Sequence, residues 1–93
     1  MELRPNSDRV FYILGMNLYK KKQYSEAISL LSKAIISNQY DHKAFDIRGD
    51  CYRRLGNLDL ALSDFEQAVA LKPENTEYSA DRNKVLQMKI APH

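Results

Sequence analysis

Residues that commonly carry out catalysis are few in this chain of 93 residues, and they do not converge. His42 falls at a predicted helix start and His93 is the last residue, so neither stands beside a nucleophile as a general base. Cys51 is the single cysteine and lies on the packed side of a predicted helix, where it would act as a small hydrophobic residue. One cysteine and two distant histidines lack the spacing of a metal site, and the isolated glycines form no phosphate-binding loop. The sequence therefore predicts no enzyme activity, no metal, no cofactor and no small-molecule substrate.

Side chains suited to binding a protein recur at helical spacing in two predicted helices, residues 8–22 and 42–55. Residues three and four positions apart share one face of a helix, so each set forms a stripe. The stripe on the first helix consists of Arg9, Tyr12, Met16, Tyr19 and Lys20. The stripe on the later helix consists of Lys43, Asp46, Ile47, Asp50, Arg53 and Arg54. The apolar and aromatic members would contact apolar side chains of a partner, and the two adjacent arginines would pair with acidic ones.

Charge separates the predicted helices. Basic residues outnumber acidic ones in residues 8–22 and 42–55, whereas Asp59, Asp64 and Glu66 make residues 57–72 net acidic. This asymmetry predicts a basic binding face that attracts an acidic segment and weakens as salt is added. The run from Lys20 to Lys22 is more simply explained as a solvated helix end favoured by the helix dipole.

Stripes of large and small residues indicate how the helices 42–55 and 58–71 pack on each other. The residues at positions i, i+4 and i+7 are Phe45, Gly49 and Tyr52 in the first of them and Ala61, Phe65 and Ala68 in the second. A glycine within a helix costs roughly 1 kcal/mol relative to alanine, and close approach of the two helix axes would compensate for it. Gly56 and Asn57 supply the break between the helices, and Pro73 ends the second one.

The same pattern occurs 34 residues earlier. The residues at that offset are Phe11, Gly15, Ala27 and Ala34 as identities, with Leu18 and Leu31 as conservative replacements. A repeat of this length with these residues resembles the tetratricopeptide repeat (TPR) family over residues 8–75. Three positions depart from the family pattern: its tryptophan is phenylalanine in both copies, Arg48 takes the place that Leu14 holds in the first copy, and Gln39 replaces the proline seen as Pro73.

The resemblance implies an all-α fold, a right-handed α-solenoid of antiparallel helix pairs with five helices. It divides the chain into an irregular lead-in (1–7), a first repeat (8–41), a second repeat (42–75), a C-terminal capping helix (76–91) and a tail (92–93). Ser79 and Asn83 stand where the pattern requires Phe45 and Gly49, so the third repeat is not completed. The terminal unit of a solenoid needs a polar outer face, which fits the role of a cap.

The resemblance also implies a concave groove that is lined by the first helix of each pair and receives a peptide segment or a partner helix. The two stripes match that groove. Some members of the family grip a C-terminal carboxylate with a clamp of Lys, Asn and Arg, but the matching positions here are Tyr12, Met16, Ile47, Glu77 and Asp81, which lack that chemistry. The implied function is a non-catalytic adaptor or scaffold that binds protein without a dicarboxylate clamp.

Two other functions stay open. The array is short, so the stripes could pack on a neighbouring repeat or a second copy, which would make the chain a structural subunit that self-associates or completes a larger assembly. Related helical repeats bind single-stranded RNA, but their period is usually longer and a net charge of +2 is small for binding phosphates.

Composition predicts the compartment. No apolar run approaches the roughly 18 residues of a membrane span, and the start of the chain lacks the order of a signal peptide. The single cysteine fits a reducing compartment, so we expect a cytoplasmic protein.

Overall fold

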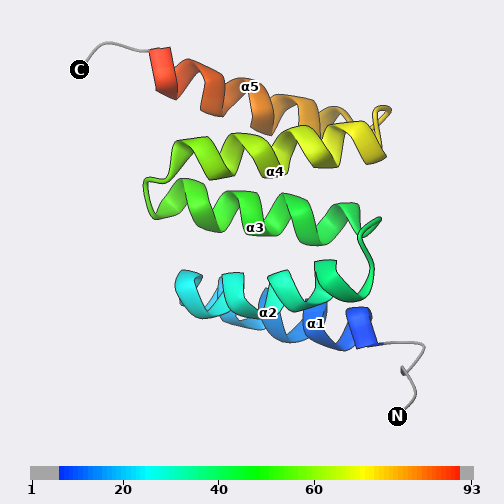
Figure 1. The fold of residues 1–93 in the computed structure, drawn as a ribbon. Helices are drawn as coiled ribbons and strands as arrows, with labels where there is room; N and C mark the ends of the chain where they lie inside the picture. Colours follow the sequence, from blue (N-terminus) through cyan, green and yellow to red (C-terminus); the bar gives the residue numbers. More distant parts are fainter. Residues whose placement is uncertain (1–6, 91–93) are drawn as a thin grey trace.

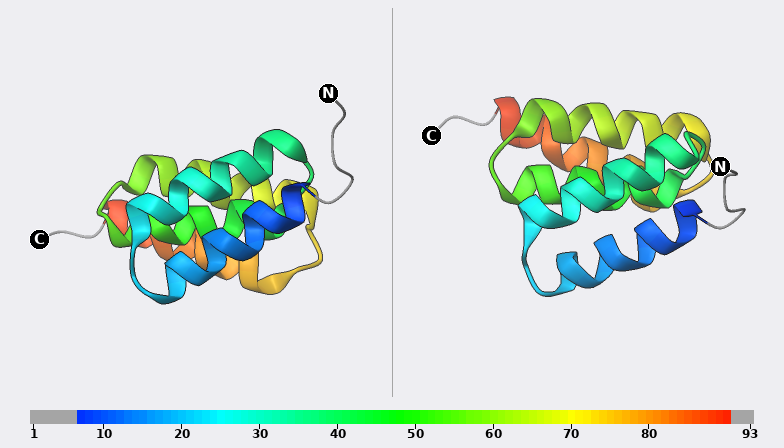
Figure 2. Two further views of the ribbon diagram at one scale, coloured as in Figure 1. Left: turned by 90° about the horizontal axis from the view of Figure 1, so that it is seen from below. Right: turned by 60° about the horizontal axis from the view of Figure 1, so that its bottom comes forward.

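Five helices stacked in chain order make up residues 7–90, the part of the chain that the computed structural model describes (Figure 1). They are α1 (Ser7–Lys20), α2 (Tyr24–Ser37), α3 (His42–Arg54), α4 (Leu58–Leu71) and α5 (Thr76–Ile90). Consecutive helices run antiparallel, so α1 and α2 form one hairpin, α3 and α4 form a second, and α5 lies against α4 (Figures 1 and 2). The predicted all-α solenoid of antiparallel pairs with five helices is confirmed.

The predicted lead-in and tail fall almost entirely outside the described residues. Ser7, which the sequence assigned to the lead-in, is the first residue of α1. Residues 1–6 and 91–93, which include the predicted tail, are not described.

Side-chain caps set the starts of three helices. Asp41 and Asn57 each accept a hydrogen bond at 3.2 Å from the backbone N–H three residues further on. Asn75 accepts one from the backbone N–H of Tyr78 at 3.3 Å. Each cap satisfies an N–H group that has no partner within its own helix. These polar residues explain why α3, α4 and α5 begin within one residue of their predicted starts.

The turn between α1 and α2 differs from its counterpart between α3 and α4. The sequence predicted a first helix that continues to Lys22, but α1 ends at Lys20 and Lys22 adopts a left-handed φ of 64°. Gly56, 34 residues later, has a φ of 86°, which glycine adopts without steric cost. Gln23 makes no side-chain cap, whereas Asn57 does. The first hairpin therefore has the less favourable turn.

The close approach predicted at Gly15 and Gly49 is confirmed. A Cβ atom at Gly15 would lie 2.8 Å from Cγ of Leu31, and one at Gly49 would lie 2.9 Å from Cε1 of Phe65. Leu31 and Phe65 are completely or almost completely buried, so neither has space to move away. Each hairpin is therefore held at a spacing that only glycine permits.

The other predicted packing residues lie around these two contacts. Buried members are Ala27, Ala34, Phe45, Ala61 and Ala68, and partly buried members are Phe11, Leu18 and Tyr52. Pro73 is exposed and follows Lys72, the C-cap of α4. Cys51 is fully buried against α2, as predicted, and burial raises the pKa of its thiol to about 12. Its reactive thiolate form is therefore disfavoured.

An ion pair lies inside the second hairpin. Arg48 donates to both carboxylate oxygens of Asp64 at 2.8 Å and to the hydroxyl of Ser32 at 3.0 Å. Asp64 is 4% exposed, so one of the three acidic residues counted in residues 57–72 is buried and contributes little negative charge to the surface. Burial raises the pKa of Asp64, and Arg48 only partly opposes this effect. The residues 34 positions earlier are Leu14 and Leu30, so the second repeat carries charge where the first carries apolar side chains.

Candidate partner-binding groove

Three of the predicted binding residues line an open hollow near the starts of α1 and α3. Arg9 and Tyr12 belong to α1 and Lys43 to α3. Its volume is about 700 Å³, and its other lining residues are Asp8, Ile13, Asn38, Tyr40, Asp41 and His42. Arg9 and Lys43 are exposed, and neither forms a salt bridge within residues 7–90. The hollow therefore combines a tyrosine ring with two cations that form no salt bridge, and the carboxylates of Asp8 and Asp41 lie in the same lining.

The turn between α2 and α3 contributes side chains that the sequence reasoning missed. Tyr40 is 68% exposed, and it lines the hollow together with Asn38. Asn38 also donates a hydrogen bond to Asp8 at 3.3 Å, which ties the turn to α1. The sequence could have indicated these two residues, because a turn that directly precedes a groove helix must lie at one end of the groove.

A second group of predicted residues forms a network around Asp50. Tyr19 of α1 donates its hydroxyl proton to Asp50, and Arg53 and Arg54 donate from their Nε atoms at 2.8 and 3.2 Å. Arg54 also lies over the ring of Tyr24, 5.8 Å from its centroid. The network joins the two hairpins through α1, α2 and α3. In the free protein both arginines are already paired, so less positive charge faces a partner than the sequence count suggests.

The electrostatics of Asp50 and Tyr19 follow from these contacts. Burial of Asp50 acts to raise its pKa, but the hydrogen bonds from Tyr19, Arg53 and Arg54 outweigh it, and the pKa is lowered. Burial and the hydrogen bond to Asp50 raise the pKa of Tyr19 to about 12. Asp50 is therefore ionised and Tyr19 protonated at neutral pH.

Asp46 faces a different environment, between α3 and α5. Burial raises the pKa of Asp46 to about 8, with further contributions from Asp81, Asp50 and Glu77. Its buried Oδ1 atom has no hydrogen-bond partner among the described residues. Glu77 and Asp81 are residues of α5, and they are two of the positions that match the clamp described in the sequence analysis. The α5 side of the groove thus carries the carboxylates of Glu77 and Asp81, whereas the hollow at the start of α1 carries the cations Arg9 and Lys43 together with Asp8 and Asp41.

The raised pKa of Asp46 predicts a pH-dependent stability. The ordinary pKa of an aspartate is about 4, so between about pH 4 and pH 8 the folded state holds a proton that the unfolded state has released. Stability should fall as the pH rises through this range. The variant Asp46→Asn removes the ionisation and should melt at least about 4 °C above wild type at pH 8, the shift that about 1 kcal/mol produces in a small domain. Thermal melts followed by circular dichroism from pH 4.5 to pH 9 measure it.

The control for this prediction is Glu66→Gln, which neutralises an exposed carboxylate on α4. Its melting curve should stay parallel to that of wild type across the same range. Parallel curves for Asp46→Asn would show that Asp46 ionises normally in the folded protein.

The remaining predicted binding residues differ in how exposed they are. Met16 is half-buried and Lys20 is exposed at the end of α1. Ile47 is partly buried against the core between the two hairpins, so only part of its side chain is open to a partner. Tyr12 and Tyr19 are partly buried and pack against the same core. The tyrosines are therefore held in place before a partner binds.

The catalytic side chains considered from the sequence lie apart in the structure. His42 contacts the Tyr78 hydroxyl through Nδ1 at 2.7 Å, and Cys51 is buried on the other side of α3 against α2. Residues 7–90 contain no group of three or more His, Cys, Asp or Glu side chains that could hold a metal ion. Within the same residues, no helix is both long enough and apolar enough to cross a membrane.

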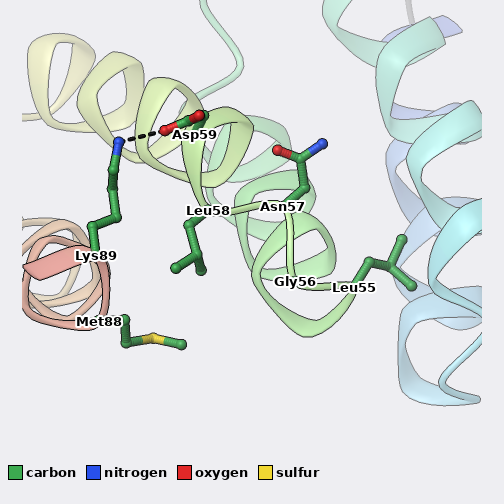
Figure 3. A pocket seen from close by; sticks show the side chains of 7 residues that line it. All are labelled: Leu55, Gly56, Asn57, Leu58, Asp59, Met88 and Lys89. Carbon is green, nitrogen blue, oxygen red and sulfur yellow. Dashed lines mark hydrogen bonds and ion pairs between the residues drawn. The ribbon is translucent and has the colours of Figure 1, made fainter. Parts of the chain in front are cut away.

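A second hollow lies away from the predicted groove residues, between the α3–α4 turn and the end of α5 (Figure 3). Its volume is about 530 Å³, and Leu55, Leu58 and Met88 supply its apolar side chains. Lys89 of α5 forms an ion pair with Asp59 of α4 beside these residues. The pair joins the last helix to the second hairpin.

Comparisons with solved structures agree with this architecture. The first TPR domain of Spaghetti (RPAP3), bound to an HSP90 peptide, superposes with a TM-score of 0.87 at 24% identity, covering 98% of this chain and 71% of that one. The type III secretion chaperone SycD of Yersinia enterocolitica, in complex with a peptide of the translocator YopD, gives 0.88 at 20% identity, covering 96% and 68%. At these identities the similarity establishes the fold.

Sequence relatives establish the family. Tetratricopeptide repeat protein 16 of Homo sapiens is 37% identical over 76 residues, which is 82% of this chain and 9% of that protein. Hsp70-Hsp90 organizing protein 3 of Arabidopsis thaliana is 36% identical over 63 residues, which is 68% of this chain and 11% of that protein. The chain thus spans about a tenth of the length of these relatives. The family model described as a tetratricopeptide repeat-like domain matches residues 14–92, and the chain belongs to the tetratricopeptide repeat family.

Proposed function

We propose that this chain is a non-catalytic protein-interaction module, an adaptor or scaffold, that binds a peptide segment or partner helix in the groove formed by α1 and α3. The observation that carries the proposal is the hollow where Arg9, Tyr12 and Lys43 meet. Its two cations lack salt bridges within residues 7–90, and the tyrosine is held by the core beneath it. Peptides bound to the two solved structures of the same fold support this role.

The groove has two electrostatic halves, which bear on the partner. The α1 side carries the cations Arg9 and Lys43 in a hollow that Asp8 and Asp41 also line. The α5 side carries the carboxylates of Glu77 and Asp81, next to Asp46, whose pKa of about 8 keeps it mostly protonated at neutral pH. An acidic segment of the partner would lie beside Arg9 and Lys43, and like charges would exclude it from the α5 side. Apolar side chains of the partner would contact Tyr12 and Met16. Because Glu77 and Asp81 occupy two of the positions that match the family's clamp and would repel a carboxylate, the binding mode does not use a dicarboxylate clamp.

The single cysteine, Cys51, bears on the cellular compartment in which the protein works. A buried cysteine whose thiol pKa is raised serves as a core residue and has no disulfide partner in the chain. We propose that the protein works in a reducing compartment, the cytoplasm.

Reversal of the two free charges tests the proposed function. Arg9→Glu combined with Lys43→Glu should weaken binding of the partner at least tenfold at about 0.15 M salt, because attraction becomes repulsion in a shared hollow. The partner is first isolated from the native source with the wild-type chain, its binding segment is mapped, and the synthetic segment is titrated by isothermal titration calorimetry. Wild-type binding should also weaken as salt is added.

A matched charge reversal away from the groove serves as the control. Lys33→Glu on α2 combined with Lys72→Glu after α4 changes the net charge equally and should leave the affinity unchanged. Equal affinities for all three proteins would refute a role for the α1–α3 groove.

A further inference from the structure

Basic side chains gather at one edge of the helix stack. The α1–α2 turn, the α3–α4 turn and the end of α5 all lie on the left in Figure 1 and in both views of Figure 2. The cations within or next to these three segments are Lys20, Lys21, Lys22, Arg53, Arg54 and Lys89. The carboxylates beside them are fewer, namely Glu26, Asp50 and Asp59. This excess is larger than the +2 of the whole chain, so positive charge is concentrated at this edge.

The lysines of the α1–α2 turn are the most accessible of these cations. Lys20, Lys21 and Lys22 are exposed, and none forms a salt bridge within residues 7–90. In the neighbouring turn, Arg53 and Arg54 share one carboxylate, so that group keeps a net positive charge. Both turns therefore present positive charge to solvent.

Lys22 carries its charge at a conformational cost. Its φ of 64° lies in the left-handed region, which a residue with a Cβ atom adopts less readily than glycine does. The turn of the second repeat has Gly56 at the equivalent place. Residues held in such conformations cluster at functional sites. A lysine at this place is evidence that its charge acts outside the fold.

Apolar side chains lie along the same edge. Leu55 at the end of α3 is 51% exposed, and Met88 of α5 is 40% exposed. Both line the hollow of about 530 Å³ beside Lys89 (Figure 3). The edge thus combines an excess of positive charge with accessible apolar surface.

We propose that this edge binds the surface of an anionic lipid membrane. Two turns and a helix end aligned along one edge allow a flat surface to contact all three at once (Figure 1). The lysines would approach acidic headgroups, and Leu55 and Met88 would enter the boundary between headgroups and acyl chains. The hollow beside Arg9 lies at the starts of α1 and α3, the opposite ends of these helices, so a partner could bind there at the same time.

The chemistry of the edge favours lipid over the other polyanions. A site for single-stranded nucleic acid combines cations with aromatic rings on which bases stack. Here the rings of Tyr19 and Tyr24 pack against each other with their centroids 6.0 Å apart, and Arg54 lies over Tyr24. The exposed apolar side chains, Leu55 and Met88, are not aromatic. They suit the boundary of a bilayer.

Vesicle co-sedimentation of the full chain tests the proposal. The chain should bind phosphatidylcholine vesicles with about 30% phosphatidylserine at least about tenfold more tightly than pure phosphatidylcholine vesicles at about 0.1 M salt. Lys21→Glu combined with Lys22→Glu should weaken this binding at least about tenfold. Lys33→Glu combined with Lys72→Glu changes the net charge equally away from the edge and should bind as wild type does. Equal binding to both vesicles, or equal losses in both variants, would overturn the proposal.

Two further measurements separate a membrane from other anionic partners. Leu55→Ser combined with Met88→Ser should weaken binding to the phosphatidylserine vesicles at least about threefold, because less apolar area enters the bilayer boundary. Circular dichroism should show that each variant keeps its helices. Single-stranded RNA or polyglutamate should bind more weakly than the vesicles at the same salt concentration. Tight binding of either polymer without vesicle binding would overturn the proposal in favour of that class of partner.

Discussion

Replacement of Gly49 by leucine is expected to unfold the chain or to lower its melting temperature by more than about 12 °C. The Cβ atom alone would lie 2.9 Å from Cε1 of Phe65 and 3.1 Å from Cβ of Asp64, and leucine adds three further carbons. Overpacking of this kind typically costs 1–3 kcal/mol and sometimes more, and about 1 kcal/mol shifts the melting temperature of such a domain by roughly 4–8 °C. Thermal denaturation followed by circular dichroism at 222 nm measures it.

Two further variants establish that the cause is steric. Ala70→Leu adds a larger side chain at an exposed position of α4 and should be nearly neutral. Gly49→Ala combined with Phe65→Ala should lose less stability than the sum of the two single changes, because removing the ring makes space for the new methyl group. Additive losses, or a Gly49→Leu variant that melts with wild type, would show that the hairpin is not held by this contact.

The ion pair between Arg48 and Asp64 should behave as a unit. Arg48→Leu alone leaves a 4% exposed carboxylate without its cation, and Asp64→Leu alone leaves a guanidinium without its acceptor, so each should cost about 3 kcal/mol. Arg48→Leu combined with Asp64→Leu reproduces the residues of the first repeat and should fall within about 1 kcal/mol of wild type. The raised pKa of Asp64 supports this expectation, since burial disfavours its charged form even beside Arg48.

Urea denaturation of wild type, the two single variants and the double variant completes a double-mutant cycle for this ion pair. The coupling free energy should be large because both single changes disrupt the same interaction. Single variants that lose less than about 1 kcal/mol would indicate that water reaches the pair and screens it, in contradiction to the burial of Asp64.

The helices and their contacts could be predicted because both depend on local residue spacing. Gly15 and Gly49 sit at the same place in two copies of one pattern, and the structure places each against a large side chain of the next helix. The end of α1 was predicted wrongly, because a lysine at residue 22 carries no signal for a left-handed conformation. Only the comparison with Gly56, 34 residues later, would have revealed it.

The charged residues could not be placed from spacing alone. Asp64 adds to the acidic charge counted in residues 57–72, yet its partner Arg48 comes from another helix, and only tertiary packing brings the two together. Asp50 and Arg53 stand three residues apart, a spacing that predicts an ion pair within one helix. That pairing bears directly on the binding surface, since a charge that is already paired contributes less to attraction of a partner.

A photoreactive phenylalanine analogue placed at Tyr12, with the protein expressed in cells of its natural source, tests the proposed groove most directly. Tyr12 lines the hollow beside Arg9, so irradiation should join the chain covalently to its partner through an acidic or apolar segment. The same analogue at Leu60, which is 45% exposed on α4, should give no such product. Equal cross-linking from both positions, or a product from Leu60 alone, would contradict a partner site between α1 and α3.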